Sequence, residues 1–186
     1  TTVPSVTEKR ARLLKQMGCW QVNMGIEVGN ETYRKNILNR PNMSNELILN
    51  SFAAIKKAGI RVSAYNMIGL PWQTRESVFE TIELNRAVKP DRINVSIFIP
   101  FRGTKLRERL LKEGYVDSQT VLGDDTQVTV NVPGDLTPAN IMGLYKTFQL
   151  YCKVPKKLFP LIKKCEKDNK NSRFVLEHLR KIYIKK

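Results

Sequence analysis

Hydrophobic residues recur along the first 114 residues with two alternating periods, one close to 3.6 and one of 2. The longer period predicts helices within residues 5–18, 30–38, 44–59, 74–88 and 104–114. The shorter period predicts strands within residues 19–27, 60–69 and 91–100. Because helix separates each strand from the next, this order predicts an α/β fold with a parallel sheet and right-handed crossovers.

Local signals mark several helix ends. Ser5 and Glu8 have the spacing of a capping box, and Gly18 stands where a left-handed C-terminal cap would fall. Ser44 and Thr74 are predicted N-caps of two further helices.

The two faces of the predicted strands differ in character. In the first strand, Trp20 begins an apolar set that includes Val22, Met24 and Ile26, whereas Asn23 and Glu27 fall on the other face. Parallel strands covered by helices on both sides are normally apolar on both faces. One polar face therefore predicts a sheet curled into a barrel with a polar interior, whose ligands bind at the carboxyl ends of the strands.

The regular pattern stops after Gly114. Residues 116–135 are predicted to form an irregular connection with a short strand at 127–132, and residues 136–186 a basic helical extension that starts with Thr137 as cap and Pro138 in the first turn. The predicted organisation is a core at 1–115, the connection at 116–135 and the extension at 136–186.

Composition narrows the function classes. The 186 residues carry a formal charge of +15, and residues 151–186 hold twelve Lys or Arg against three acids. Such a tail could attract nucleic acid, but few aromatics lie among its charges, which favours solvated amphipathic helices. The sequence has no membrane-span pattern or signal peptide, and its three scattered cysteines indicate neither a disulfide framework nor a zinc site, so a cytoplasmic protein is predicted.

Glu27 and Arg40 are the candidate binding residues of the first strand and the segment after it. A carboxylate at a strand end can accept hydrogen bonds from both hydroxyls of a ribose diol, and a guanidinium can bind a ligand carboxylate in bidentate fashion. The alternative is that the two side chains only pair with each other or with neighbours, and spacing alone leaves both interpretations open.

Two further segments leave strands through Pro or Gly and enter helices, at residues 69–74 (GLPWQT) and 99–106 (IPFRGTKL). Gly69 would let a flat ring approach the backbone, whose polar groups can bind the edge of a purine. The alternative is an ordinary turn before a capped helix, which is the favoured interpretation of either segment taken alone. His178 and the three cysteines are assigned no catalytic role.

Three blocks taken together, residues 18–40, 54–77 and 89–106, resemble the latter half of the radical S-adenosylmethionine (radical SAM) core, in particular the branch that often carries a cobalamin-binding domain. The resemblance extends over residues 6 to about 113. It implies the C-terminal half of a partial (β/α)6 barrel, in which this chain supplies strands four to six, followed by the helical extension of that branch.

The resemblance also implies roles for particular residues. Glu27 matches the acid that binds the ribose of S-adenosylmethionine, and Arg40 a basic position near the methionine carboxylate. Two segments match those that contact the adenine. These are Met67, Ile68, Gly69, Leu70 and Pro71 on the fifth strand and Phe98, Ile99 and Pro100 on the sixth.

The chain departs from the family pattern at two places. It has no C-x-x-x-C-x-x-C triplet to hold a [4Fe–4S] cluster, and Trp72 and Gln73 stand where the family more often has Gly and Glu. Since it also begins at Thr1, we expect a fragment or split form that is inactive alone. Its partners would be S-adenosylmethionine, an unknown substrate and an N-terminal half that carries the cluster ligands, with cobalamin in the parent protein left open.

Three functional hypotheses follow. The first is the C-terminal part of a radical SAM enzyme, which binds the nucleoside end of the cofactor for 5′-deoxyadenosyl radical chemistry. The second is a basic module that binds nucleic acid or an acidic partner. The third is an unrelated (β/α) enzyme with Glu27 as general base.

Overall fold

The computed structural model of the protein describes residues 2–119, 123–128, 130 and 132–184. Its backbone divides into two compact units, and each is considered by itself below. Unit 1 comprises Thr1–Asn66 and Glu76–Asn94, and unit 2 comprises Met67–Arg75 and Val95–Lys186. The element order is η1 (Val3–Ser5), α1 (Glu8–Gln16), β1 (Gln21–Glu27), α2 (Glu31–Asn36), α3 (Asn45–Lys57), β2 (Arg61–Ile68), α4 (Arg75–Val88), β3 (Arg92–Ile97), α5 (Lys105–Lys112), α6 (Pro138–Lys153), η2 (Lys156–Leu158), α7 (Phe159–Lys164) and α8 (Lys170–Tyr183).

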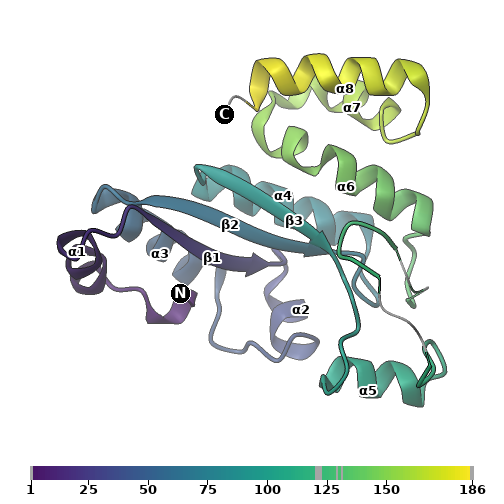
Figure 1. Ribbon diagram of the computed structural model, residues 1–186, viewed down its shortest axis with the longest axis horizontal. Coiled ribbons are helices and arrows are strands. Elements are labelled where there is room, and N and C mark those ends of the chain that lie inside the picture. The colour runs from purple at the N-terminus through teal and green to yellow at the C-terminus, as the bar shows by residue number, and fades with distance from the viewer. Residues whose placement is uncertain (1, 120–122, 129, 131, 185–186) are drawn as a thin grey trace. The chain divides into compact units, whose positions relative to one another are not determined.

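The three strands form an open parallel sheet in the order β1-β2-β3, which confirms the predicted α/β fold and strand direction (Figure 1). The β1 and β2 partners run from Gln21 with Arg61 to Gly25 with Tyr65, and then shift so that Glu27 pairs with Asn66. This arrangement, followed by helices, is consistent with part of a barrel and a helical extension.

The core of unit 1 lies between the sheet and helices α3 and α4, which lie on the same side of it (Figure 1). Val22, Met24 and Ile26 of β1 are buried in alternation with more exposed neighbours, as the period of 2 predicts. From α3, Phe52 and Ile55 are fully buried in the same cluster. Each such apolar side chain contributes roughly 1.5–3 kcal/mol by its removal from water.

Several helix ends agree with the sequence patterns, and one does not. The hydroxyl of Ser44 accepts a hydrogen bond from the backbone N–H of Leu47 and caps α3, and Gly18 has the left-handed φ of 85°. However, α1 is capped by Thr7, whose hydroxyl accepts from the Arg10 N–H, so the prediction of Ser5 as the cap is wrong. Ser5 instead ends the short helix η1.

Trp20 and the short strand at 127–132 are the two strand predictions that the structure does not confirm. Trp20 was expected on the apolar face of the first strand, but it precedes β1 and is 67% exposed. The short strand expected at 127–132 includes residues 129 and 131, which lie outside the described residues.

The C-terminal helices of unit 2 pack around α6. Its buried residues include Leu144, Phe148 and Tyr151, and Thr137 and Asn140 form a capping box at its start. No helix in the described part of the chain is long and apolar enough to cross a membrane. The domain boundaries predicted from the sequence remain a prediction.

Gly29 provides a test of packing in unit 1. Its N–H donates to the Thr81 hydroxyl at 2.8 Å, and a Cβ at this position would lie 2.3 Å from the backbone of Glu80. We expect Gly29→Ala to lower the free energy of unfolding by at least about 2 kcal/mol, because rigid backbone must move. The matched control is Gly18→Ala, which meets no atom within 4 Å and should cost only about 1 kcal/mol for its positive φ. Chemical denaturation measures both, and equal losses would contradict the prediction.

Candidate functional site

The end of β1 has an irregular backbone that sets the position of Glu27. A register shift between Gly25 and Glu27 makes Ile26 an extra residue, as in a β-bulge, and Glu27 has a φ of 64°. Bulges re-aim side chains next to functional sites, and left-handed conformations of residues other than glycine cost about 1 kcal/mol or more. The strand therefore ends in a strained conformation that places one carboxylate.

Arg40 reaches this carboxylate after a short helical detour. Asn30 caps α2 by accepting from the Tyr33 N–H, and after the helix the Arg40 N–H donates to the Arg34 carbonyl at 2.8 Å. The guanidinium of Arg40 then lies 3.3 Å from the Glu27 carboxylate, with the two side chains 46% and 18% exposed. The structure thus brings these two predicted residues together.

The environment of Glu27 disfavours its charge. Burial raises the pKa of this carboxyl above its ordinary value, and the positive charge of Arg40 opposes that shift without cancelling it. Space around the carboxylate depends on Gly25, since a Cβ there would lie 2.6 Å from the Glu27 Oε1. Gly25 is therefore needed for this side-chain position.

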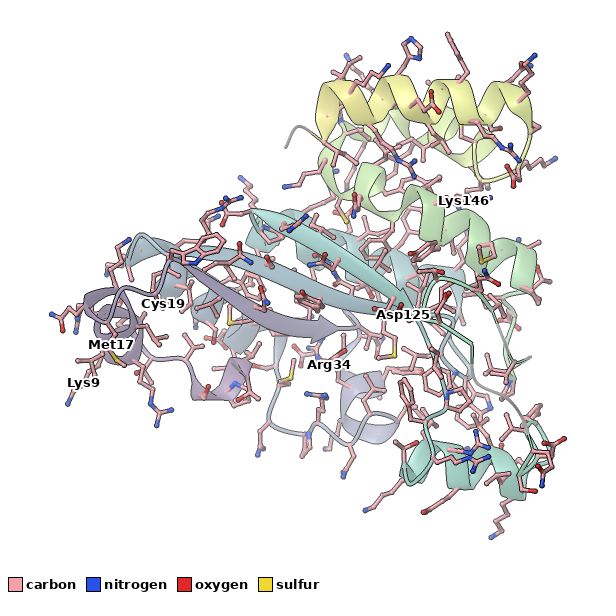
Figure 2. The ribbon with its side chains drawn as sticks, viewed as in Figure 1. Lys9, Met17, Cys19, Arg34, Asp125 and Lys146 are labelled. Carbon is pink, nitrogen blue, oxygen red and sulfur yellow. The ribbon has the colours of Figure 1, made fainter. Side chains whose placement is uncertain are left out.

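The sequence patterns did not single out Arg34, which lies fully buried near the carboxyl end of β1 (Figure 2). Its guanidinium donates to the carbonyl of Val28, to the carbonyl of Met43 at 2.9 Å and to the side-chain oxygen of Asn45 at 2.6 Å. These bonds fix the loop directly after Glu27. An arginine in a short helix gives no sequence signal of burial, because only tertiary packing decides which way it turns.

In unit 2, the predicted segment at residues 67–71 forms a tight turn. Gly69 has a φ of 71°, and its N–H and that of Leu70 both donate to the Gln73 Oε1, at 2.8 and 3.3 Å. Trp72 has a φ of 57°, a conformation that glycine adopts freely, and the guanidinium of Arg109 lies 3.8 Å from its ring centroid. Gln73 is 1% exposed, and its Nε2 has no hydrogen-bond partner among the described residues.

The second predicted segment of unit 2, Phe98 to Pro100, is buried beside this turn. The Phe98 N–H donates to the Ile68 carbonyl at 2.8 Å, and the Pro100 carbonyl accepts from Arg107 at 2.9 Å. Glu27 and Arg40 are thus paired in unit 1, and the two backbone segments are joined in unit 2. That all ten residues serve one site remains a prediction.

The described residues contain no group of three His, Cys, Asp or Glu side chains that could hold a metal ion. Cys19 is half-buried in unit 1, and Cys152 and Cys165 are buried in unit 2. Burial raises the pKa of the Cys165 thiol, which disfavours the thiolate that metals bind. The cysteines of this chain do not fit an iron-sulfur cluster.

Comparison with known proteins gives a context for this geometry. Residues 1–84 match the family model described as the radical SAM superfamily. The chain is therefore similar to that family over 84 of its 186 residues.

Two curated relatives also align with about half of this chain. A biotin synthase from Vesicomyosocius okutanii subsp. Calyptogena okutanii is 30% identical over 105 residues, which cover 55% of this chain and 31% of the relative. An uncharacterized methyltransferase from Pyrococcus horikoshii is 29% identical over 106 residues, which cover 57% of this chain and 23% of the relative. The chain therefore spans less than a third of the length of these two relatives.

The buried guanidinium of Arg34 should be essential for the stability of unit 1. We expect Arg34→Met to lower the free energy of unfolding by about 3 kcal/mol, because the carbonyls of Val28 and Met43 would stay buried without a donor. Arg12→Met is the control, since Arg12 is exposed and 3.7 Å from Glu8 in a surface pair. It should change stability by less than about 0.5 kcal/mol. Comparable effects of the two changes in urea unfolding would contradict this assignment.

The raised pKa of Glu27 predicts how its loss affects stability. The folded carboxyl binds its proton more tightly than the unfolded one, so wild-type stability falls as pH rises from the unfolded pKa through the raised folded pKa. Glu27→Gln removes this penalty and should be as stable as wild type or more stable at pH 7. Denaturation midpoints measured between about pH 4 and 8 should show the difference growing with pH. A variant that loses stability relative to wild type as pH rises would show that the Arg40 ion pair dominates.

Proposed function

We propose that this chain supplies the nucleoside-binding part of a radical SAM enzyme. In this proposal, Glu27 accepts hydrogen bonds from the two ribose hydroxyls, and Arg40 binds the carboxylate of the methionine moiety. The backbone of residues 67–71 and 98–100 binds the adenine. When bound, S-adenosylmethionine and its cluster supply the radical chemistry, and the cluster ligands would come from an N-terminal half.

The observation that carries the proposal is the strained, mostly buried carboxylate of Glu27 beside Arg40. The left-handed φ of Glu27 and the burial that raises the pKa of its carboxyl both lower the stability of the folded chain. A purely structural role for Glu27 does not explain why these two destabilising features are present. A ligand that donates two hydrogen bonds to the ionised carboxylate would offset that cost. Gly25 leaves the space that such a carboxylate position requires.

The adenine part of the proposal rests on the turn of unit 2. Gly69 carries no side chain, and Gln73 Oε1 accepts the Gly69 and Leu70 N–H groups as a glutamate could. Trp72 takes a left-handed conformation, which glycine adopts more readily than other residues. Trp72 and Gln73, where the family more often has Gly and Glu, are thus compatible with a turn at this point of the chain. The use of cobalamin, the substrate and the reaction type stay open.

A second candidate function draws on the same residue. A carboxyl with a raised pKa suits a general base that works near neutral pH, so Glu27 could serve a (β/α) enzyme unrelated to S-adenosylmethionine. That function requires a substrate whose turnover is lost in Glu27→Gln without iron or S-adenosylmethionine. The radical SAM match over residues 1–84 favours the first proposal.

Titration with adenosine tests the proposed role of Glu27. Binding to this chain should be millimolar at best, because hydrogen bonds to charge contribute about 1.5–3 kcal/mol when desolvated and less in an open site. Glu27→Gln should weaken adenosine about five- to tenfold, measured by NMR. Glu8→Gln is the matched control, since Glu8 is an exposed carboxylate 3.0 Å from Lys57, and should bind as wild type does.

Two further outcomes sharpen this test. Arg40→Gln should weaken S-adenosylmethionine and S-adenosylhomocysteine more than adenosine, which lacks the amino-acid carboxylate. Equal adenosine affinity in wild type and Glu27→Gln would remove the ribose role from Glu27. In a longer parent protein, the same Glu27→Gln change should lower cofactor affinity without altering cluster content.

A further inference from the structure

A half-buried ionic cluster in unit 2 joins the end of the proposed adenine-binding turn to the C-terminal extension. Arg75 donates to both carboxylate oxygens of Glu166, at 2.8 and 2.5 Å, and the Tyr151 hydroxyl donates to the same carboxylate at 2.6 Å. The side chains of Arg75 and Glu166 are 28% and 12% exposed. The bidentate geometry fixes both position and orientation of the guanidinium.

The place of Arg75 in the fold makes this pairing informative. Arg75 is the first residue of α4, where the helix dipole disfavours a positive charge. The hydrogen bonds that Arg75 donates to Glu166 raise the pKa of Arg75 above its ordinary value, although burial opposes that shift. Burial and Glu166 together raise the pKa of Tyr151, so its hydroxyl stays protonated and remains a donor.

Glu166 is itself held against α6. A Cβ on Gly143 would lie 2.8 Å from the Glu166 carbonyl oxygen and 2.9 Å from its Cβ, so only glycine permits this approach without movement. Tyr151 lies two helical turns further along α6 and binds the side chain. The Glu166 carboxylate is therefore fixed by its contacts with α6.

The same part of the chain contacts the turn at its other residues. A Cβ on Gly69 would lie 3.1 Å from Ile141 of α6. The Trp72 N–H donates to the carbonyl of Pro133, and a Cβ on Gly134 would lie 3.2 Å from the Trp72 Cα. Contacts from residues after 132 thus hold the turn at its beginning, its middle and, through Glu166, its end.

We propose that Glu166 is a positioning residue for nucleoside binding, which holds residues 69–75 in their binding conformation through Arg75. The helical extension then sets the affinity of a site whose binding atoms lie in the turn. The proposal rests on the proposed function, because it assigns the turn to the nucleoside. The effect of Glu166 on the conformation of residues 69–75 does not depend on adenosine binding.

Amide hydrogen exchange in the full chain tests the positioning role. In Glu166→Gln, the amides of Leu70 and Trp72 should exchange at least about fivefold faster, while amides within α6 keep their wild-type rates. Asp168→Asn is the matched control, because Asp168 is a half-exposed carboxylate two residues away that pairs with Lys146 and Arg173. Its turn amides should exchange as in wild type. Tyr151→Phe, which removes one hydrogen bond and no charge, should give a smaller effect in the same direction.

Adenosine titration of the same variants completes the test. Glu166→Gln should weaken adenosine about three- to tenfold, and Asp168→Asn should not. The proposal is overturned if the turn amides keep their wild-type exchange, if all amides of unit 2 accelerate equally, or if the turn loosens while adenosine affinity stays unchanged. If wild type itself binds no adenosine, the proposed function fails, and the exchange data alone then decide whether Glu166 holds the turn.

Discussion

The buried guanidinium of Arg34 is the interaction on which the corner after β1 depends. It supplies donors to the Val28 and Met43 carbonyls, which lie on two segments that would otherwise leave buried acceptors unsatisfied. Val28 follows Glu27 directly, so the bonds that stabilise the corner also fix the backbone of the candidate site. Because the donors of Arg34 are engaged by the backbone and Asn45, Arg40 is the cation that faces the Glu27 carboxylate.

The turn of unit 2 solves a similar problem with different residues. Two successive N–H groups after β2 point inward, and the side-chain oxygen of Gln73 accepts both. Trp72 has a left-handed φ, its ring lies against the guanidinium of Arg109, and its N–H donates to the Pro133 carbonyl. A glycine at position 72 would adopt this φ at a lower conformational cost than Trp72 does.

Much of this fold was predictable because it follows from periodicity. The alternation in β1, the helix between successive strands and the Ser44 cap are local patterns, and the structure has them where the sequence predicts. Other features depend on contacts between distant residues. The burial of Arg34 and the 91-residue separation of Arg75 and Glu166 leave no local pattern, and Trp20 looked like a strand residue only because its apolar side chain continued the alternation.

The sequence predicted which residue types form the candidate site, but it did not predict their backbone conformation or burial. A carboxylate at a strand end and an arginine one helix later indicated binding chemistry, whereas the bulge, the φ of Glu27 and the space above Gly25 required coordinates. These features matter because each one disfavours the folded chain or restricts its sequence. Glu27 carries a strained backbone and a charge that burial opposes, and its exposed partner Arg40 cancels only part of the cost. Natural cores rarely retain such a residue for stability alone, so the stabilisation that balances it is best sought in a bound ligand that donates to the carboxylate.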